Sequence, residues 1–562
     1  MSPIHPVGMP AGLDYPDALV GDILAGTARR YPERVALRDG ELSLTYAELY
    51  DRALRVAQGL RERGLAAGDA VALHQPNSLW YTVSYFGVVL AGCTVAPLNP
   101  TLPPALLAQQ MADAGVVAAF THPATAPALG QAGTDALKLV VTVPPTPAAP
   151  APQDAQPPAD AVPLADLLLA EAAPATRVAT DAVVHLSFTG GTTGRSKAVR
   201  VLHRNVVANV IQMNCWRSGS LPALDAHGGV VLDPVPEAQT DNTIRVGRDT
   251  FVAVAPMFHA LGLVSQVGNV LNACTTVVMG RFEPTLFLEL VDRHQASTMV
   301  GSPALFHALM AVPRDKEGGF PSVRSVVSGA APIDTTTLAG MQKLFPNAWV
   351  AEGYGLTEAT IGLSTGTLER DPSVPLGTVG APVFDTEIEI RGLLGTDGAL
   401  PTGEVGEIWA RGPQIADGYH GAPELTAEQF RDGWLRTGDL GCFDEHGLLR
   451  IVGRAKDMLI YKGYNVYPTQ LEELLSAHPA VAQVAVVGAA RSDAGEIPVA
   501  YVVRTPGGSG TSAEELMAYV AERVAPYQKV RELHFLDSLP TSAAGKILKT
   551  ELRKLRRGAE GA

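Results

Sequence analysis

The stretch from Ser187 to Lys197, SFTGGTTGRSK, combines glycines, hydroxyls and a lysine directly after an apolar run. Glycines let a backbone turn with its N–H groups exposed, while hydroxyl and ammonium groups add donors and positive charge, so the segment suits a polyphosphate. Its spacing does not fit the GxxxxGK[ST] pattern of a Walker A loop. A flexible Gly/Thr turn is the alternative interpretation. We predict nucleotide contacts from Thr189, Gly190, Gly191, Thr192, Thr193, Gly194 and Lys197.

Further segments along the chain contain residues that could bind a nucleotide or stabilise charge. Taken singly, each has a structural alternative: a core aromatic, a surface acid, a turn-forming aspartate or a solvated lysine. They occur in the order Gly353–Glu358 (GYGLTE), Thr437–Leu440 (TGDL), Val452–Asp457 (VGRAKD), Gly463–Asn465 (GYN) and Pro540–Ile547 (PTSAAGKI).

Together with the Ser187–Lys197 loop, these segments resemble the signature motifs of the adenylate-forming superfamily. That superfamily includes acyl-CoA synthetases, nonribosomal peptide adenylation domains and firefly-type luciferases. The resemblance extends over almost the whole chain and keeps the order of the motifs. It implies a large N-terminal AMP-binding domain over residues 1–455 and a small, mobile C-terminal domain over residues 456–562 that carries the catalytic lysine. It also implies that the chain uses ATP, Mg²⁺ and CoA.

The charge chemistry of acid activation supports catalytic roles for three residues. Joining a carboxylate to an α-phosphate concentrates negative charge in the transition state, and Lys546 is the candidate to neutralise that charge. The resemblance implies that Glu358 holds Mg²⁺, which prefers oxygen ligands and takes few of them from protein. It further implies that Thr357 bonds the α-phosphate.

The nucleoside side of the predicted site depends on an aromatic ring and a carboxylate. The resemblance implies that Tyr354 lies on adenine, while the acceptor-only carboxylate of Asp439 suits two ribose hydroxyls. Arg454 would support the same sugar. The remaining nucleotide-binding predictions from the motifs are Gly329, Ala330 and Gly355.

The acyl side is predicted from Pro256–Gly262, PMFHALG, and from Ser328–Pro332, SGAAP. His259 resembles the gate residue of acyl-CoA synthetases, although a satisfied core histidine is the alternative. Gly262 and Ser328 complete the predicted acyl pocket. Relatives that activate amino acids have an Asp near His259 to pair with the substrate ammonium, and none is present here. We therefore expect a neutral alkyl or aryl acid.

The second half-reaction is predicted from the hinge region. Lys456 matches the family's hinge position, and Gly463 would face the CoA thiol. Two departures bear on the acceptor: Ile460 stands where luciferases and coumarate ligases have Lys, and residues 452–458 lack the insertion typical of fatty acyl-AMP ligases. We predict an ATP-dependent acid:CoA ligase (AMP-forming). The alternatives are a ligase that loads an acyl carrier protein or performs only one half-reaction, and a silent nucleotide-binding protein that kept the fold.

Composition limits the other possible functions. The 562 residues include 46% hydrophobic and 18% charged residues, which is typical of a multidomain globular protein. The net charge of −14 argues against a nucleic-acid partner. Four widely spaced cysteines predict neither a disulfide framework nor a zinc site. The first residues do not form a secretory signal, and we expect no transmembrane segment and a cytoplasmic protein.

The elements that must position these residues follow from the apolar pattern. From residue 182 to residue 351, short β-rich runs alternate with helices of about ten residues, which predicts βα units on a largely parallel sheet. Beyond Asp385, strands separated by turns predict a barrel-like part, and residues after Arg454 predict a small α+β domain. The fold class is therefore α/β plus α+β. Two irregular stretches, 121–163 and 218–248, are expected to be surface loops.

Overall fold

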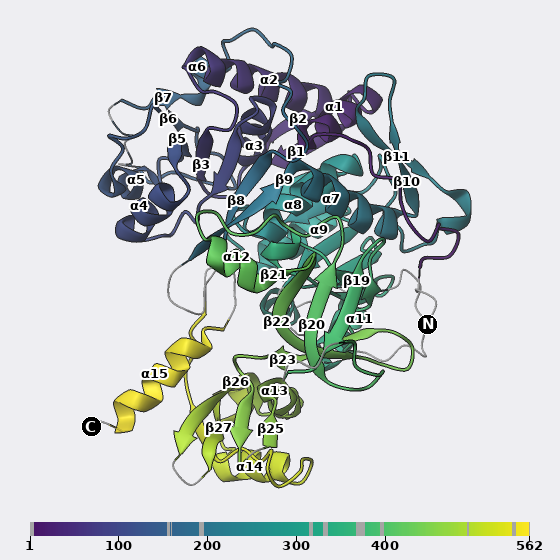
Figure 1. Cartoon of the computed structure of the whole chain (residues 1–562), viewed down its shortest axis with the longest axis vertical. Helices are drawn as coiled ribbons and strands as arrows, with labels where there is room; N and C mark the ends of the chain where they lie inside the picture. The colour runs from purple at the N-terminus through teal and green to yellow at the C-terminus, as the bar shows by residue number, and fades with distance from the viewer. Residues whose placement is uncertain are drawn as a thin grey trace.

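The computed structural model describes residues 5–153, 155, 158, 160–189, 196–313, 318–329, 335–366, 377–393, 398–462, 464–491, 494–541 and 547–560. Figure 1 shows a large body above a smaller C-terminal body, with α15 (Lys549–Glu560) extending beside the latter. No helix in these ranges is long and apolar enough to span a membrane.

A seven-stranded sheet, ordered β7-β6-β5-β3-β4-β8-β9, forms one part of the large body. Its neighbours are parallel except for the antiparallel β8–β9 pair. Parallel strands end at one common edge, so the end of β8 lies on the edge where such sheets bind ligands. The strands are β3 (Ala70–His74), β4 (Thr94–Pro97), β5 (Val116–Thr121), β6 (Leu139–Thr142), β7 (Val162–Pro163), β8 (Val183–Thr189) and β9 (Lys197–Leu202).

A nine-stranded sheet, ordered β18-β17-β16-β15-β14-β12-β13-β1-β2, forms the second part. The strands from β16 to β1 are parallel, and antiparallel pairs close both edges. The strands are β1 (Val35–Asp39), β2 (Leu42–Thr45), β12 (Thr250–Ala253), β13 (Thr275–Val278), β14 (Thr298–Gly301), β15 (Ser325–Ser328), β16 (Trp349–Tyr354), β17 (Ser364–Thr365) and β18 (Ala381–Pro382).

One large core joins both sheets through the helices between them. In α3, LWYTVSYFGVVL, no residue is charged and nearly every residue is buried, as expected of a helix with apolar neighbours all round. The contacting helices are α1 (Val20–Arg30), α2 (Tyr46–Glu62), α3 (Leu79–Leu90), α7 (His203–Ser218) and α8 (Ala260–Leu271).

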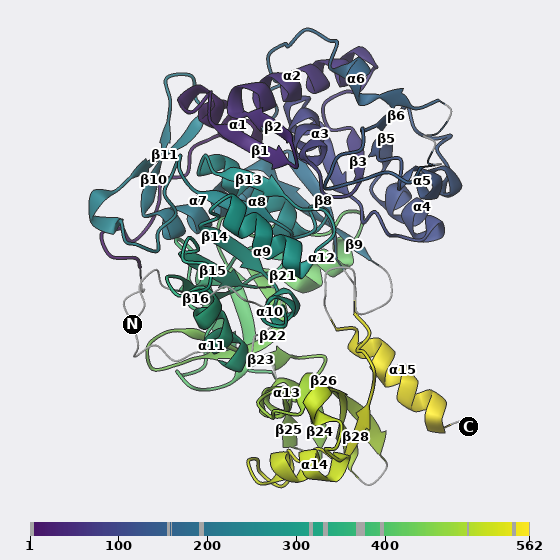
Figure 2. The same ribbon diagram turned by 180° about the vertical axis from the view of Figure 1, so that it is seen from behind.

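Further helices cover the outer faces of the two sheets. A second core forms under α9 (Pro284–Arg293), α10 (Pro303–Met310) and α11 (Thr335–Leu344), which Figure 2 shows beside β14, β15 and β16. A third core lies under α4 (Pro104–Asp113) and α5 (Ala126–Ala132). Short α6 (Leu164–Leu167) packs on α2.

An antiparallel sheet follows in the chain, ordered β19-β20-β22-β21 with β23 paired to β22. The prediction of strands beyond Asp385 is confirmed, although the longest of them, β22, was not predicted. The elements are β19 (Glu387–Arg391), β20 (Gly406–Arg411), α12 (Pro423–Gln429), β21 (Phe430–Arg431), β22 (Trp434–Phe443) and β23 (Leu449–Arg454).

The C-terminal part has a core of its own, built from residues between Leu459 and Leu552. A capping box begins its second helix, since Ser512 and Glu515 bond each other's backbone N–H groups. The elements are β24 (Leu459–Tyr461), β25 (Tyr464–Val466), α13 (Pro468–Ser476), β26 (Val481–Arg491), β27 (Gly495–Arg504), α14 (Ala513–Ala521), β28 (Glu532–Phe535) and α15.

Both irregular stretches contain more structure than predicted. Residues 121–163 include α5, β6 and β7, and the two strands extend the seven-stranded sheet. The VPPTPAAPAP run itself forms no strand, because proline lacks an N–H donor. Residues 218–248 include a hairpin of β10 (Ser220–Leu224) and β11 (Val230–Pro234). The prediction of plain surface loops was therefore wrong in both places.

Candidate active site

The stem of the predicted phosphate loop is formed by the antiparallel strands β8 and β9. Thr189 ends β8 opposite Lys197, the first residue of β9, and the Ser196 hydroxyl donates to the Thr189 carbonyl at 2.7 Å. The loop's Gly190, Gly191, Thr192, Thr193 and Gly194 lie outside the described residues. The antiparallel stem thus holds Lys197 beside the end of β8.

Glu358 and Lys197 both contact Tyr419, the first at its hydroxyl and the second at its ring. The Tyr419 hydroxyl donates to Glu358 Oε1 at 2.8 Å, and Lys197 Nζ lies 5.6 Å from the centre of the Tyr419 ring. Burial, and then the Glu358 charge, raises the pKa of Tyr419, so its phenol remains a neutral donor. No described side chain donates to the other carboxylate oxygen, Oε2. One oxygen of Glu358 is therefore held by Tyr419, and the other has no side-chain donor among the described residues.

Glu358 is positioned by a tight turn after β16. Thr357, Glu358 and Ala359 form a single 3-10 turn, and Thr360 follows with a positive φ of 63°. The Thr360 hydroxyl donates to Gln414 O at 2.7 Å, and Ala416 N donates to Glu358 O at 2.9 Å. These bonds fix the turn from outside, so Thr357 and Glu358 are held just beyond the end of β16.

Gly355 is needed for this turn. A Cβ atom at residue 355 would collide with the carbonyl of Ile361, which belongs to the backbone and cannot rotate away. The predicted importance of Gly355 therefore has a local steric cause: it allows the chain after β16 to fold back closely. Whether Gly355 also contacts a nucleotide stays a prediction.

Asp439 joins β16 to the antiparallel sheet. Its Oδ2 accepts from the Tyr354 hydroxyl at 2.8 Å, and its Oδ1 lies 3.1 Å from Arg454 Nε. Asp439 and Arg454 face each other in the β22–β23 register, and Thr437 Oγ1 accepts from the Asp439 N–H. Burial, and then the Asp439 charge, raises the pKa of Tyr354. The structure thus brings together three predicted residues from distant motifs.

The carboxylate of Asp439 retains hydrogen-bonding capacity. An ionised carboxylate offers about four lone-pair positions on its two oxygens. Tyr354 donates to Oδ2, and the Arg454 guanidinium forms an ion pair with Oδ1. At least one acceptor position per oxygen therefore remains, which matches a ligand with two adjacent hydroxyls.

His259 caps the first turn of α8. Its Nδ1 accepts from the N–H of Leu261 at 3.3 Å, and its side chain is only half-buried. The segment before it is held by Asn77, whose amide donates to Ala255 O at 3.0 Å and accepts from Met257 N at 2.8 Å. Asn77 follows β3 and bonds to the chain after β12, so it ties the two sheets together at the carboxyl ends of these strands and fixes the segment that leads to His259.

The predicted pocket glycines have different surroundings. At Gly262, a Cβ would collide with the Pro256 carbonyl, so this glycine permits close backbone packing. At Gly329, the one atom of the described residues that a Cβ would meet is Gly353 O at 3.9 Å. Ser328 ends β15 with its hydroxyl buried and no partner among the described residues. Ala330 lies outside those residues. Their contacts with an acid stay predictions.

The hinge region connects to the C-terminal helix. Lys456 lies in a turn directly after β23, and the next residue, Asp457, accepts from Arg553 of α15 at 2.6 Å. Gly463 and Lys546 lie outside the described residues. The ends of the 542–546 segment are joined by a bridge between Thr541 and Ile547. The residue that follows Lys546 is thereby fixed against the rest of the small domain.

Comparison with known proteins settles the family. The AMP-binding enzyme model matches residues 24–420, and the model of the AMP-binding enzyme C-terminal domain matches residues 470–546. The chain belongs to the AMP-binding enzyme family.

Individual relatives agree with this family assignment. The chain is 33% identical over 538 residues to 4-coumarate–CoA ligase-like 4 of Oryza sativa subsp. japonica, covering 94% of this chain and 91% of that protein. It is 32% identical over 530 residues to a feruloyl-CoA synthase of Amycolatopsis, covering 94% and 97%. The crystal structure of ATP-bound MatB from Rhodopseudomonas palustris superposes with a TM-score of 0.81 at 28% identity, covering 96% and 99%. The predicted superfamily and fold class are confirmed.

Sequence reasoning missed two residues that form hydrogen bonds with segments of the predicted site. Tyr419 is 61 residues from Glu358, and Asn77 is 180 residues from Met257. Neither residue has a charge or a spacing relation to the recognised motifs. Their only local signals are turn residues, Gly418 before Tyr419 and Pro76 before Asn77, which do not indicate a partner.

Proposed function

We propose that this chain is an ATP-dependent acid:CoA ligase (AMP-forming) that works in two steps. In the first, a carboxylate oxygen attacks the α-phosphate of ATP to give acyl-adenylate and pyrophosphate. In the second, the CoA thiol attacks the acyl carbon, and thioester and AMP leave. The observation that carries the proposal is the convergence of Tyr354, Asp439 and Arg454 at one strand edge, near Glu358 on the following turn.

The residues fit a nucleotide bound across this edge. Asp439 keeps two acceptor positions for the ribose hydroxyls, and the Tyr354 ring next to it suits adenine. Glu358 Oε2 would hold Mg²⁺, which, when bound, neutralises phosphate charge. Thr357 and Lys197 would contact phosphate oxygens. Lys546 would supply the positive charge between carboxylate and α-phosphate.

For the acid, we propose a neutral fatty or aryl acid. His259 and Gly329, which has one described atom near its Cβ position, support a pocket on this side. The segment from Pro256 to Gly262 contains no carboxylate, and burying a substrate ammonium without a partner costs several kcal/mol. If the acid is a fatty acid, the proposed role is in fatty acid metabolism.

We further propose CoA as the acyl acceptor and rotation of residues 456–562 about Lys456 between the two steps. The relatives named as CoA ligases support CoA. An acyl carrier protein is the alternative acceptor, supported by Ile460 in place of the lysine of coumarate ligases. The four free cysteines support a reducing compartment, and we propose the cytoplasm.

The test is an acid panel of short, medium and long fatty acids and aryl acids. AMP, pyrophosphate and thioester are measured with and without CoA. We expect acid-dependent AMP and thioester with CoA, and pyrophosphate exchange without it. AMP release that does not depend on acid contradicts the proposal, and adenylate that CoA does not discharge favours the carrier-protein alternative.

Lys546→Ala tests whether Lys546 acts in the first step alone. We expect it to lower adenylation by about 10² to 10³, which is typical of losing one preorganised electrostatic contact. Thioester formation from synthetic acyl-adenylate should fall much less, because the α-phosphate chemistry is already complete. Equal losses in both assays would contradict separate roles for the two conformations.

A further inference from the structure

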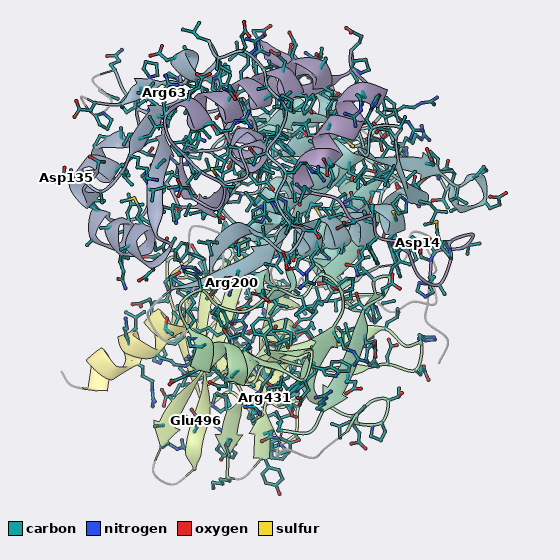
Figure 3. All side chains as sticks on the ribbon, turned by 45° about the horizontal axis from the view of Figure 1, so that its top comes forward. Asp14, Arg63, Asp135, Arg200, Arg431 and Glu496 are labelled. Atoms are coloured by element: carbon teal, nitrogen blue, oxygen red, sulfur yellow. The ribbon has the colours of Figure 1, made fainter. Side chains whose placement is uncertain are left out.

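Tyr419 is fixed beside the phosphate-loop stem by backbone pairing. Residues 417–420 add to the edge of β9: Asp417 N donates to Arg200 O, Arg200 N to Gly418 O and His420 N to Ala198 O, at 2.8 to 3.0 Å. An ion pair between Arg200 and Asp417 at 3.0 Å reinforces the pairing. Arg200, labelled in Figure 3, lies where the large sheets meet the antiparallel sheet. This segment is therefore held in register with Lys197.

The Tyr419 side chain then reaches two charged groups that come from different elements. Its ring is buried, packs edge-on against Phe430 at 5.8 Å and lies under the Lys197 ammonium. The face of an aromatic ring attracts a cation, so the ring restricts where that ammonium lies. Its hydroxyl reaches past the ring to Glu358.

We propose that Tyr419 is a positioning residue for adenylation, which orients Glu358 through its hydroxyl and Lys197 through its ring. By occupying Oε1, the hydroxyl directs Oε2 of Glu358 toward the divalent cation, and one rigid side chain sets the separation between cation ligand and ammonium. This inference rests on the proposed function, because it requires Glu358 to bind Mg²⁺ and Lys197 to bind phosphate. A structural tyrosine that only fills the core next to Phe430 is the competing explanation.

Two substitutions separate the hydroxyl from the ring. Tyr419→Phe keeps the ring and its volume but removes the bond to Glu358. We expect the Mg²⁺ concentration at half-maximal pyrophosphate exchange to rise about tenfold, as for loss of a hydrogen bond to a charged group, with the maximal rate nearly kept. Tyr419→Leu also removes the ring, so the KM for ATP should rise as well, by about fivefold for a lost cation–π contact.

Phe430→Leu is the matched control, since it loosens the same packing without touching Glu358 or Lys197. We expect a lower Tm and an unchanged Mg²⁺ titration. A Tyr419→Phe titration that superimposes on wild type, or a Phe430→Leu variant with the same Mg²⁺ shift, would overturn the inference.

Glu358→Gln distinguishes failure of the positioning role of Tyr419 from failure of the proposed metal site at Glu358. If Glu358→Gln raises the Mg²⁺ requirement and Tyr419→Phe does not, the positioning role fails and the proposed metal site stands. If Glu358→Gln leaves the Mg²⁺ titration unchanged, the proposed metal site itself fails and the positioning role fails with it. All titrations use the full chain with ATP and acid at saturation.

Discussion

Replacing Asp439 by Asn tests the proposed nucleotide geometry directly. The substitution keeps the side-chain shape but turns one acceptor oxygen into an N–H₂ donor and removes the charge. Tyr354 donates to one carboxylate oxygen and Arg454 pairs with the other, and the remaining lone pairs on the two oxygens could accept from the ribose hydroxyls. The single asparagine oxygen can accept from at most one of two adjacent hydroxyls once Tyr354 has taken its bond.

The magnitude follows from the number of bonds lost. A hydrogen bond to a charged group contributes about 1.5 to 3 kcal/mol, so loss of one ribose contact should lower kcat/KM for ATP by about 10- to 150-fold. The assay is ATP–pyrophosphate exchange at saturating acid. The KM for the acid should change little, because Asp439 lies on the nucleotide side of the proposed site.

Deoxy-ATP analogues make the assignment specific. With the wild-type enzyme, removing the contacted hydroxyl should lower kcat/KM for the nucleotide by a similar factor. With Asp439→Asn the same analogue should lower kcat/KM much less, since the contact is already lost. Glu407→Gln is the control: Glu407 is a buried carboxylate paired with Arg436 at 2.9 Å in the same sheet. It should lower stability without changing discrimination. Equal deoxy-ATP penalties in wild type and Asp439→Asn would refute the ribose role.

Three further outcomes are expected. Lys456→Pro fixes φ near about −65° at the proposed hinge, so adenylate should form while thioester formation fails; wild-type turnover would place the hinge elsewhere. Gly329→Val should keep the wild-type Tm, because Gly353 O is the one described atom near the new Cβ, and it should raise the KM of bulky acids more than that of short ones. Burial lowers the pKa of His74 and of His203 to about 4, below the unfolded value near 6.5. The imidazoles of the unfolded chain therefore take up protons at a higher pH than those of the folded chain. The Tm should fall as pH drops from 6.5 toward 4, and His74→Leu should reduce that dependence of Tm on pH.

Local composition predicted the alternating strands and helices between residues 182 and 351 because each element there carries its own pattern. The helix over residues 284–293 begins at a proline, which suits a first helical turn, and the apolar run before Thr189 forms β8. By contrast, β6 and β22 were missed. β6 is a four-residue strand in an Ala/Pro-rich stretch, and β22 contains two glycines and lacks regular alternation. Both strands depend on neighbours already in place rather than on their own pattern.

The sequence by itself determined which chemistry the chain carries: the Gly/Thr loop ending at Lys197, the acid at residue 358 and the carboxylate at residue 439 are readable as residue types in motifs. Only the tertiary structure decided how these groups constrain one another. Tyr354 meets Asp439 across 85 residues, and Tyr419 meets Glu358 across 61. Such contacts depend on sheet order and strand register, which arise from packing over the whole core. A residue that positions a charge therefore has no signature in the sequence until the strand beside it is known.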